Sequence, residues 1–91
     1  MSYQEKRREP RHAASGRITF RIAGENGRTV EASLVDVSQH GFRATHSHAR
    51  LATGQEVWYE CSGEQGRARV IWTRILGSEV QSGFLILVPA A

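Results

Sequence analysis

The chain has 91 residues, with 12 Lys and Arg against 9 Asp and Glu, and a formal net charge of +3. That length accommodates one domain and excludes a (β/α)₈ barrel, a full dinucleotide-binding domain or a two-domain enzyme. At 40% hydrophobic residues the chain is too apolar to be disordered throughout, yet no apolar run approaches the ~20 residues of a membrane helix. The absence of a hydrophobic leader and the single cysteine, Cys61, favour a cytoplasmic protein without an internal disulfide.

The amino end carries most of the surplus positive charge. Its bases within the first twelve residues are Lys6, Arg7, Arg8 and Arg11. Pro10, Gly16 and the charge run all oppose regular structure there. The sequence therefore predicts a flexible basic arm at residues 1–16, followed by a single domain at residues 17–91.

Strand-like alternation of polar and apolar residues dominates the rest of the chain. It predicts strands at residues 17–22, 29–37, 42–45, 56–61, 67–75 and 80–88. The second of these changes its apolar phase, so we expect a bulge or bend between Leu34 and Asp36. In the fifth, the alternation assigns Trp72 to the same face as Ala68 and Val70.

Short strands separated by turn signals every 8–14 residues are typical of all-β proteins. Closing the sheet removes its free edges, which favours a small six-stranded antiparallel β-barrel over an open sheet. The helical candidate, at residues 48–53, is a turn at most, and no long C-terminal helix is predicted.

Two arginines of the arm, Arg7 and Arg11, are four residues apart. A guanidinium presents its N–H donors as a fixed fork that fits phosphate oxygens, and it also fits the O6 and N7 acceptors of guanine. The alternative interpretation is a solvated terminal charge run, which is common in proteins.

A second candidate element, Asp36-x-Ser38-x-x-Gly41, follows the strand at residues 29–37. Its carboxylate can accept the paired N1–H and N2–H donors of guanine, the hydroxyl can bond beside it, and the glycine permits a sharp turn. The alternative is a local turn in which the Asp and Ser side chains bond nearby backbone.

The remaining candidates have structural explanations. His46-x-His48 has the residue types of a metal site, but no third ligand lies nearby, so a solvent-exposed loop is expected. Cys61 is expected to be a small buried side chain, and Trp58 and Trp72 to lie in the core or at the barrel rim. The alternative for Trp72 is a position at the rim where its ring stacks on a guanine. The residues suggest no catalytic group and no metal site, so an enzyme is not expected.

Taken together, the motifs resemble the PilZ domain, a bacterial receptor module for the second messenger cyclic di-GMP. The resemblance covers about residues 5–88, including Arg7-x-x-x-Arg11, Asp36-x-Ser38-x-x-Gly41 and the closing segment Val80-Gln81-Ser82-Gly83-Phe84. It implies a six-stranded barrel with no cofactor other than the ligand itself.

The resemblance also implies roles for individual residues. Arg7 and Arg11 would grip phosphates and guanines, with Arg8 as an alternative first grip, while Asp36 and Ser38 would hold a guanine above Gly41. The basic residue before the first arginine, Lys6, favours a stacked pair of ligands. The expected mechanism is an arm that orders over the barrel on binding and thereby signals to a partner protein. The receptor hypothesis is also compatible with a homodimer.

Two other functions fit the same composition. A small basic β-barrel can bind single-stranded nucleic acid, although the charge here concentrates on the arm and the aromatic residues are in core phase. The third functional hypothesis is a PilZ-like module that binds no ligand and recruits a partner protein.

Overall fold

The computed structural model describes residues 10–22, 28–47 and 51–91 of the chain, and within these residues it is built from strands alone. The strands are β1 (His12–Ala13), β2 (Arg17–Ile22), β3 (Thr29–Val37), β4 (Gly41–His46), β5 (Glu56–Cys61), β6 (Glu64–Leu76) and β7 (Glu79–Val88). The described ranges contain no helix long and apolar enough to span a membrane.

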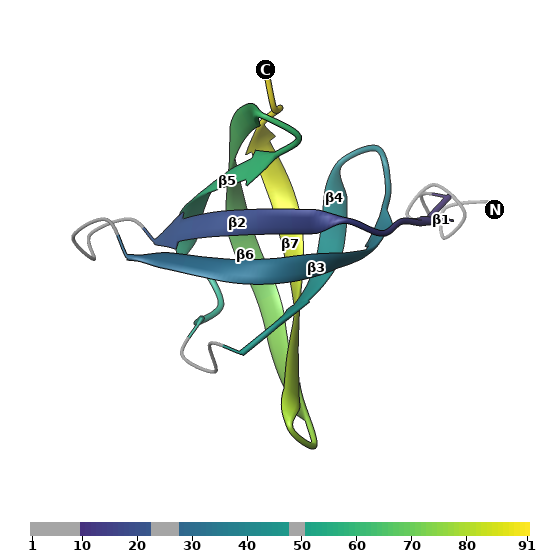
Figure 1. Ribbon diagram of the computed structural model, residues 1–91, viewed down its shortest axis with the longest axis vertical. Helices are drawn as coiled ribbons and strands as arrows, with labels where there is room; N and C mark the ends of the chain where they lie inside the picture. Colours follow the sequence, from purple (N-terminus) through teal and green to yellow (C-terminus); the bar gives the residue numbers. More distant parts are fainter. Residues whose placement is uncertain (1–9, 23–27, 48–50) are drawn as a thin grey trace, which may run out of the picture.

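The sheet closes on itself, which confirms the predicted barrel. Its strands follow the order β1-β3-β2-β5-β6-β7-β4, every pairing is antiparallel, and a further pairing between β3 and β4 completes the circuit. Six strands form the barrel, and the extra strand β1 pairs with the end of β3, on the edge that β2 occupies farther along β3. Figure 1 shows β2 and β3 crossing in front of β6 and β7, with the β6–β7 hairpin extending beyond the barrel.

The six predicted strands appear at nearly the predicted positions, with ends that differ by three residues or fewer. One departure lies in the arm, where residues 1–16 were expected to be irregular. His12 and Ala13 instead pair with Val37 and Asp36 of β3. Gly24-Glu25-Asn26-Gly27, whose composition predicts a hairpin turn, lies outside the described residues, as does part of the expected helical turn at 48–53.

Three phenylalanines from different strands form the centre of the core. The ring of Phe84 is stacked on those of Phe20 and Phe42, with centroid distances of 4.7 and 4.8 Å. All three side chains are almost completely buried. Burying a phenylalanine stabilises the folded state by roughly 1.5–3 kcal/mol, so this cluster ties β2, β4 and β7 together.

Candidate functional site

One row of cross-strand neighbours runs across the outer face of the barrel. In order, its members are Ala13 of β1, Asp36 of β3, Arg43 of β4, Gly83 of β7 and Trp72 of β6. Directly opposed residues on antiparallel strands project from the same face. The row therefore gathers a carboxylate, a guanidinium and an indole from segments far apart in the sequence.

A bulge in β3 places Asp36 in this row. Val30, Ala32 and Leu34 alternate toward the core, and Asp36 would continue that series in a regular strand. The register instead shifts between Leu34 and Asp36, as the sequence predicted. Because a one-residue shift exchanges the two faces of a strand, Asp36 turns to the outer face while Val37 packs against the core.

A second bulge, in β6, does the same for Trp72. Val70 pairs with Phe84 and Trp72 pairs with Gly83, so Ile71 has no opposite residue on β7. The sequence-based assignment of Trp72 to the face of Val70 is therefore wrong. The indole lies on the outer face against Gly83, where an added Cβ would overlap the ring.

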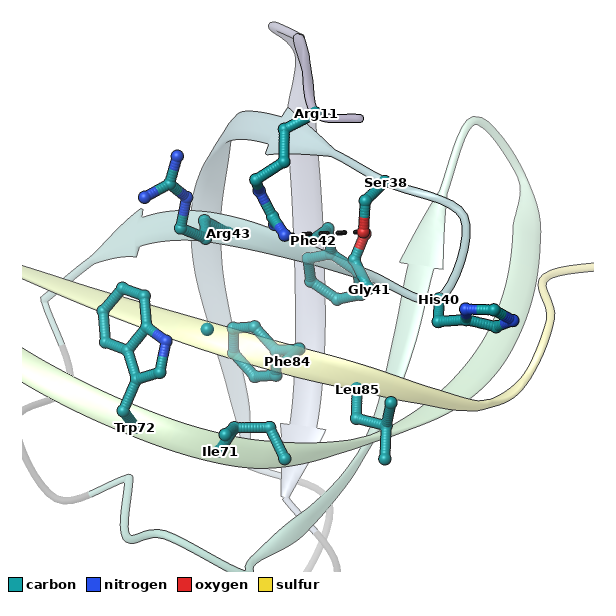
Figure 2. A pocket seen from close by; sticks show the side chains of 11 residues that line it. Arg11, Ser38, His40, Gly41, Phe42, Arg43, Ile71, Trp72, Phe84 and Leu85 are labelled. Atoms are coloured by element: carbon teal, nitrogen blue, oxygen red, sulfur yellow. Dashed lines mark hydrogen bonds between the residues drawn. The ribbon is translucent and has the colours of Figure 1, made fainter. Parts of the chain in front are cut away.

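An open pocket of about 320 Å³ lies along the row. Arg11, Arg43 and Trp72 line it, and Figure 2 shows their side chains around Phe84 and the turn that carries Ser38, His40 and Gly41. Its walls combine guanidinium groups with aromatic and aliphatic surface. This combination suits a ligand that has both anionic and flat, ring-shaped parts.

Arg11 reaches the pocket from the residues just before β1. Its Nε donates to Oδ1 of Asp36 at 3.0 Å, and its NH2 nitrogen lies 2.9 Å from the same oxygen. Its NH1 group donates to Oγ of Ser38 at 3.4 Å. The structure thus brings together three residues that the sequence singled out: Arg11, Asp36 and Ser38.

Arg43 is a site residue that the sequence reasoning missed. Its Nε donates to Oδ2 of Asp36 at 2.7 Å, and its NH2 group donates to the same oxygen. A signal was present, because Val37 and Phe42 pair across a short turn and this makes Asp36 and Arg43 direct cross-strand neighbours. Opposite charges at such positions attract each other.

The two arginines change the acidity of Asp36. The hydrogen bonds from Arg43 are the largest influence and lower the pKa of the carboxyl group below its ordinary value. Burial opposes this effect, and Arg11 adds to the lowering. Asp36 is only 6% exposed, so its carboxylate has lost most of its hydration. The charged donors of the two arginines compensate for this loss and keep the group ionised at neutral pH.

Ser38 and Gly41 form the turn between β3 and β4. The backbone N–H of Ser38 donates to the carbonyl of Gly41 at 2.8 Å, and its hydroxyl donates to the same carbonyl at 3.3 Å. A Cβ on Gly41 would overlap the carbonyl oxygen of Phe84, so only glycine permits this close approach of β4 to β7. The turn therefore needs a glycine at position 41 irrespective of any ligand, and the Ser38 hydroxyl adds a hydrogen bond within it.

Some of the candidate residues lie elsewhere. Arg7 and Arg8 are outside the described residues, as are Lys6 and His48. His46 was expected in a solvent-exposed loop, which is wrong, because its ring is buried in β4 and its Nε2 lies 2.8 Å from Oγ of Ser82. Within the described ranges, no group of three or more His, Cys, Asp or Glu side chains is placed to hold a metal ion.

The other singled-out side chains are peripheral to the pocket. Cys61 is half-buried and packs against the core cluster. Trp58 is 39% exposed on β5, where the guanidinium carbon of Arg67 lies 5.6 Å from its ring centroid. Trp58 is therefore outside the core, contrary to the core-phase assignment of the aromatic residues.

The fold is a closed antiparallel barrel, and its outer face carries an open pocket lined by two guanidinium groups and an indole. The chain belongs to the PilZ domain family, which it matches over residues 5–85. PilZ domains are binding modules for cyclic di-GMP rather than enzymes. No curated protein shows significant similarity to the chain.

Proposed function

We propose that this protein is a cytoplasmic cyclic di-GMP receptor in which the N-terminal arginine arm orders over the barrel and presents a new surface to a partner protein. The observation that carries the proposal is the position of Arg11. Its guanidinium is held by Asp36 and Ser38 at the wall of an open pocket, in a chain of the PilZ family.

The chemistry of the ligand matches the pocket. Cyclic di-GMP carries two phosphodiester anions and two guanines. Arg11 and Arg43 offer forked donors for the phosphate oxygens and for the acceptor edge of guanine. The ring of Trp72 and the apolar floor at Phe84 offer surface on which a purine can stack.

The size of the pocket supports a role for the arm. A volume of about 320 Å³ is at the lower end for small-molecule sites, so we infer that the pocket accepts part of the ligand and the arm covers the rest. Arg7 and Arg8 are the arm residues proposed to grip it, together with Arg11. Ordering a segment on binding costs several kcal/mol, which the charge-assisted hydrogen bonds must exceed.

The nucleic-acid alternative requires a stripe of uncompensated positive charge along the barrel. On the face formed by β5 and β6, however, Glu56 lies 3.2 Å from Arg69 and 3.5 Å from Arg67. These pairs reduce the positive potential near the exposed Trp58. The face with an exposed aromatic residue is therefore a poorer match for a phosphate backbone than the Arg11 pocket.

Isothermal titration calorimetry with cyclic di-GMP tests the proposal. The parent protein should bind, and Arg7→Ala or Arg8→Ala should weaken binding. The variant with the larger loss of affinity identifies which of these two arginines is the first phosphate-binding residue of the arm. Arg11→Ala should weaken it by about tenfold or more, because a charged hydrogen-bond network is lost. Arg28→Ala is the control, because Arg28 is exposed and directly precedes β3, whereas Asp36 lies near the far end of that strand.

Each competing function has its own outcome in the same experiment. A flat calorimetric trace with the parent protein would contradict the receptor function and favour the ligand-free interaction module. If the protein binds single-stranded RNA with an affinity that falls steeply with salt, and shows no heat of binding with cyclic di-GMP, the nucleic-acid hypothesis is favoured. The measured stoichiometry separates one bound ligand from a stacked pair.

A further inference from the structure

The β6–β7 hairpin extends beyond the barrel and has one unpaired edge. β6 pairs with β5 only over residues 64–69, whereas its pairing with β7 continues to Leu76. On the other side of the hairpin, β4 covers β7 over residues 80–85. Figure 1 shows the hairpin projecting past the other strands. Among the described strands, therefore, none pairs with the outer part of β6 on the edge that faces away from β7.

The unpaired part of this edge begins after Val70 and ends at the hairpin turn. The N–H of Val70 donates to the carbonyl of Gln55 at 2.8 Å, and its carbonyl accepts from the N–H of Gly54 at 2.7 Å. At the other end, Gly77 turns the chain with a φ of 64°. We call residues 71–76 of β6 the free edge. Alternate residues of a strand direct N–H and C=O to each side, so about half of the backbone groups of this segment are available to another strand.

The side chains of the free edge do little to prevent such pairing. Its residue types are mainly β-branched, aromatic and aliphatic, which favours extended structure. Ile75 is 64% exposed and Leu76 is 46% exposed. Arg74 is the single charged residue of the segment, and its guanidinium carbon lies 5.1 Å from the ring centroid of Trp72. Proteins usually protect an exposed edge with several charges, a proline or a covering segment.

We propose that the free edge pairs with the free edge of a second copy of this chain, as two antiparallel strands related by a two-fold axis. The sheets of the two barrels would then be continuous through their hairpins. A contact of this symmetry uses the same surface on both copies, so it closes at the dimer. The inference goes beyond the proposed function, because no step of it needs cyclic di-GMP.

A second copy fits this edge because its side chains complement themselves. Directly opposed residues of antiparallel strands share a face, so a two-fold axis at the middle of the free edge allows two registers, with Thr73 opposite Thr73 or Arg74 opposite Arg74. The second register opposes like charges, which is destabilising. The first places Arg74 opposite Trp72 of the other copy, where a guanidinium and an indole attract each other. The predicted register is therefore the one centred on Thr73.

The size of the contact predicts a weak dimer. In this register the pairing covers residues 71–75 of each copy, which is much less than the ~1,600 Å² of a standard interface. Backbone hydrogen bonds supply most of the attraction, and the exposed side chain of Ile75 adds apolar area. Dimerisation should therefore depend on protein concentration and proceed without ligand.

Sedimentation velocity without ligand, from about 10 µM to about 1 mM protein, tests the proposal. The average mass of the parent should rise from one copy toward two. Ile75→Lys should need about tenfold more protein for the same dimer fraction, because a charge at an edge opposes pairing. Val88→Lys is the matched control, since Val88 is 45% exposed but pairs with Arg67 at the barrel end of the hairpin. It should dimerise like the parent.

Cysteine cross-linking tests the register. Opposed Cα atoms of antiparallel strands are about 4.5–5.5 Å apart, which is within the range of a disulfide. In a Cys61→Ser background, Thr73→Cys should form a linked dimer with oxidised glutathione. Ser78→Cys, in the exposed hairpin turn, is the control for random collisions and should link more slowly. Faster linking by Arg74→Cys than by Thr73→Cys would overturn the predicted register.

Two other outcomes would overturn the dimer itself. A parent protein that stays monomeric at every concentration would leave the free edge to an extended segment of another protein. Equal weakening by Ile75→Lys and Val88→Lys would place the contact elsewhere on the surface. Thermal unfolding verifies that each variant is folded, which is expected for Ile75→Lys because the side chain is exposed. Amide hydrogen exchange of the parent gives an independent readout, since protection of residues 71–76 should increase with protein concentration.

Discussion

Replacing Arg43 by alanine should destabilise the fold, because Asp36 would lose the partners of one carboxylate oxygen while remaining covered. The side chain of Asp36 is 8% exposed, so water cannot fully replace the two donated N–H groups. A lost hydrogen bond to a charged group costs about 1.5–3 kcal/mol, and the remaining bond to Arg11 places the expected loss near the lower end. For a domain of this size, the midpoint of thermal unfolding should fall by roughly 5–15 °C.

The pH dependence of that loss tests its cause. The pKa of Asp36 is lowered in the folded protein, mainly by Arg43, from an ordinary value of 3.8. A carboxyl group whose pKa is lowered on folding stabilises the folded protein at pH values above its pKa in the unfolded chain. This stabilisation disappears as the pH falls through its pKa in the folded protein. The destabilisation by Arg43→Ala should therefore be greatest above about pH 4 and shrink as the solution is acidified further.

Circular dichroism melts at neutral pH and at a series of pH values below 4 measure this effect. Arg69→Ala is the control, since its partner Glu56 is 38% exposed and such a surface pair contributes about 0–1 kcal/mol. An Arg43→Ala melting point equal to that of the parent at neutral pH would refute the reasoning. So would a loss that stays constant as the pH falls.

Three further perturbations have defined outcomes. Ser82→Ala removes one hydrogen-bond partner of the buried His46 ring and should lower the free energy of unfolding by about 1 kcal/mol in a urea titration. An unchanged midpoint would contradict the contribution assigned to this hydrogen bond. Gly83→Ala places a Cβ where the Trp72 ring lies, so the indole must move and cyclic di-GMP affinity should fall; unchanged affinity would exclude Trp72 from the site. Burial raises the pKa of Tyr59, so stability should decrease as the pH rises above 10, and Tyr59→Phe should flatten that decline when melts are compared from pH 9 to 11.

The strands were predictable because alternation is a local property of the sequence. The bulge in β3 was also predictable, since the apolar residues Leu34 and Val37 fall in different phases and only an inserted residue reconciles them. The bulge in β6 left no such trace, because Ile71 and Trp72 are both apolar and the alternation continues through either phase. The sequence therefore assigned Trp72 to the face of Val70, although stacking of its ring on a guanine at the barrel rim had been considered.

The candidate site was predictable where its residues belong to a spaced motif and less so where they depend on pairing. Arg11, Asp36 and Ser38 were selected from the sequence and lie in contact. Arg43 required the register of the β3–β4 turn, which fixes its position opposite Asp36. His46 lies on the same face of β4 as the buried Phe42 and Ala44, but the predicted strand ended at Thr45 and the alternation was not extended to it. Its contact with Ser82, 36 residues away on another strand, leaves no local trace in the sequence.

The central claim, that cyclic di-GMP binds at the row formed by Asp36, Arg43, Gly83 and Trp72, is tested most directly by a nuclear magnetic resonance titration of the ¹⁵N-labelled protein. The two indole N–H signals act as matched reporters, because Trp72 lines the pocket and Trp58 lies outside it. We predict that the Trp72 signal and the amides of Ser38 to Arg43 shift on titration while the Trp58 signal stays in place. Shifts centred on Trp58, with the Trp72 indole unmoved, would contradict this account of the site.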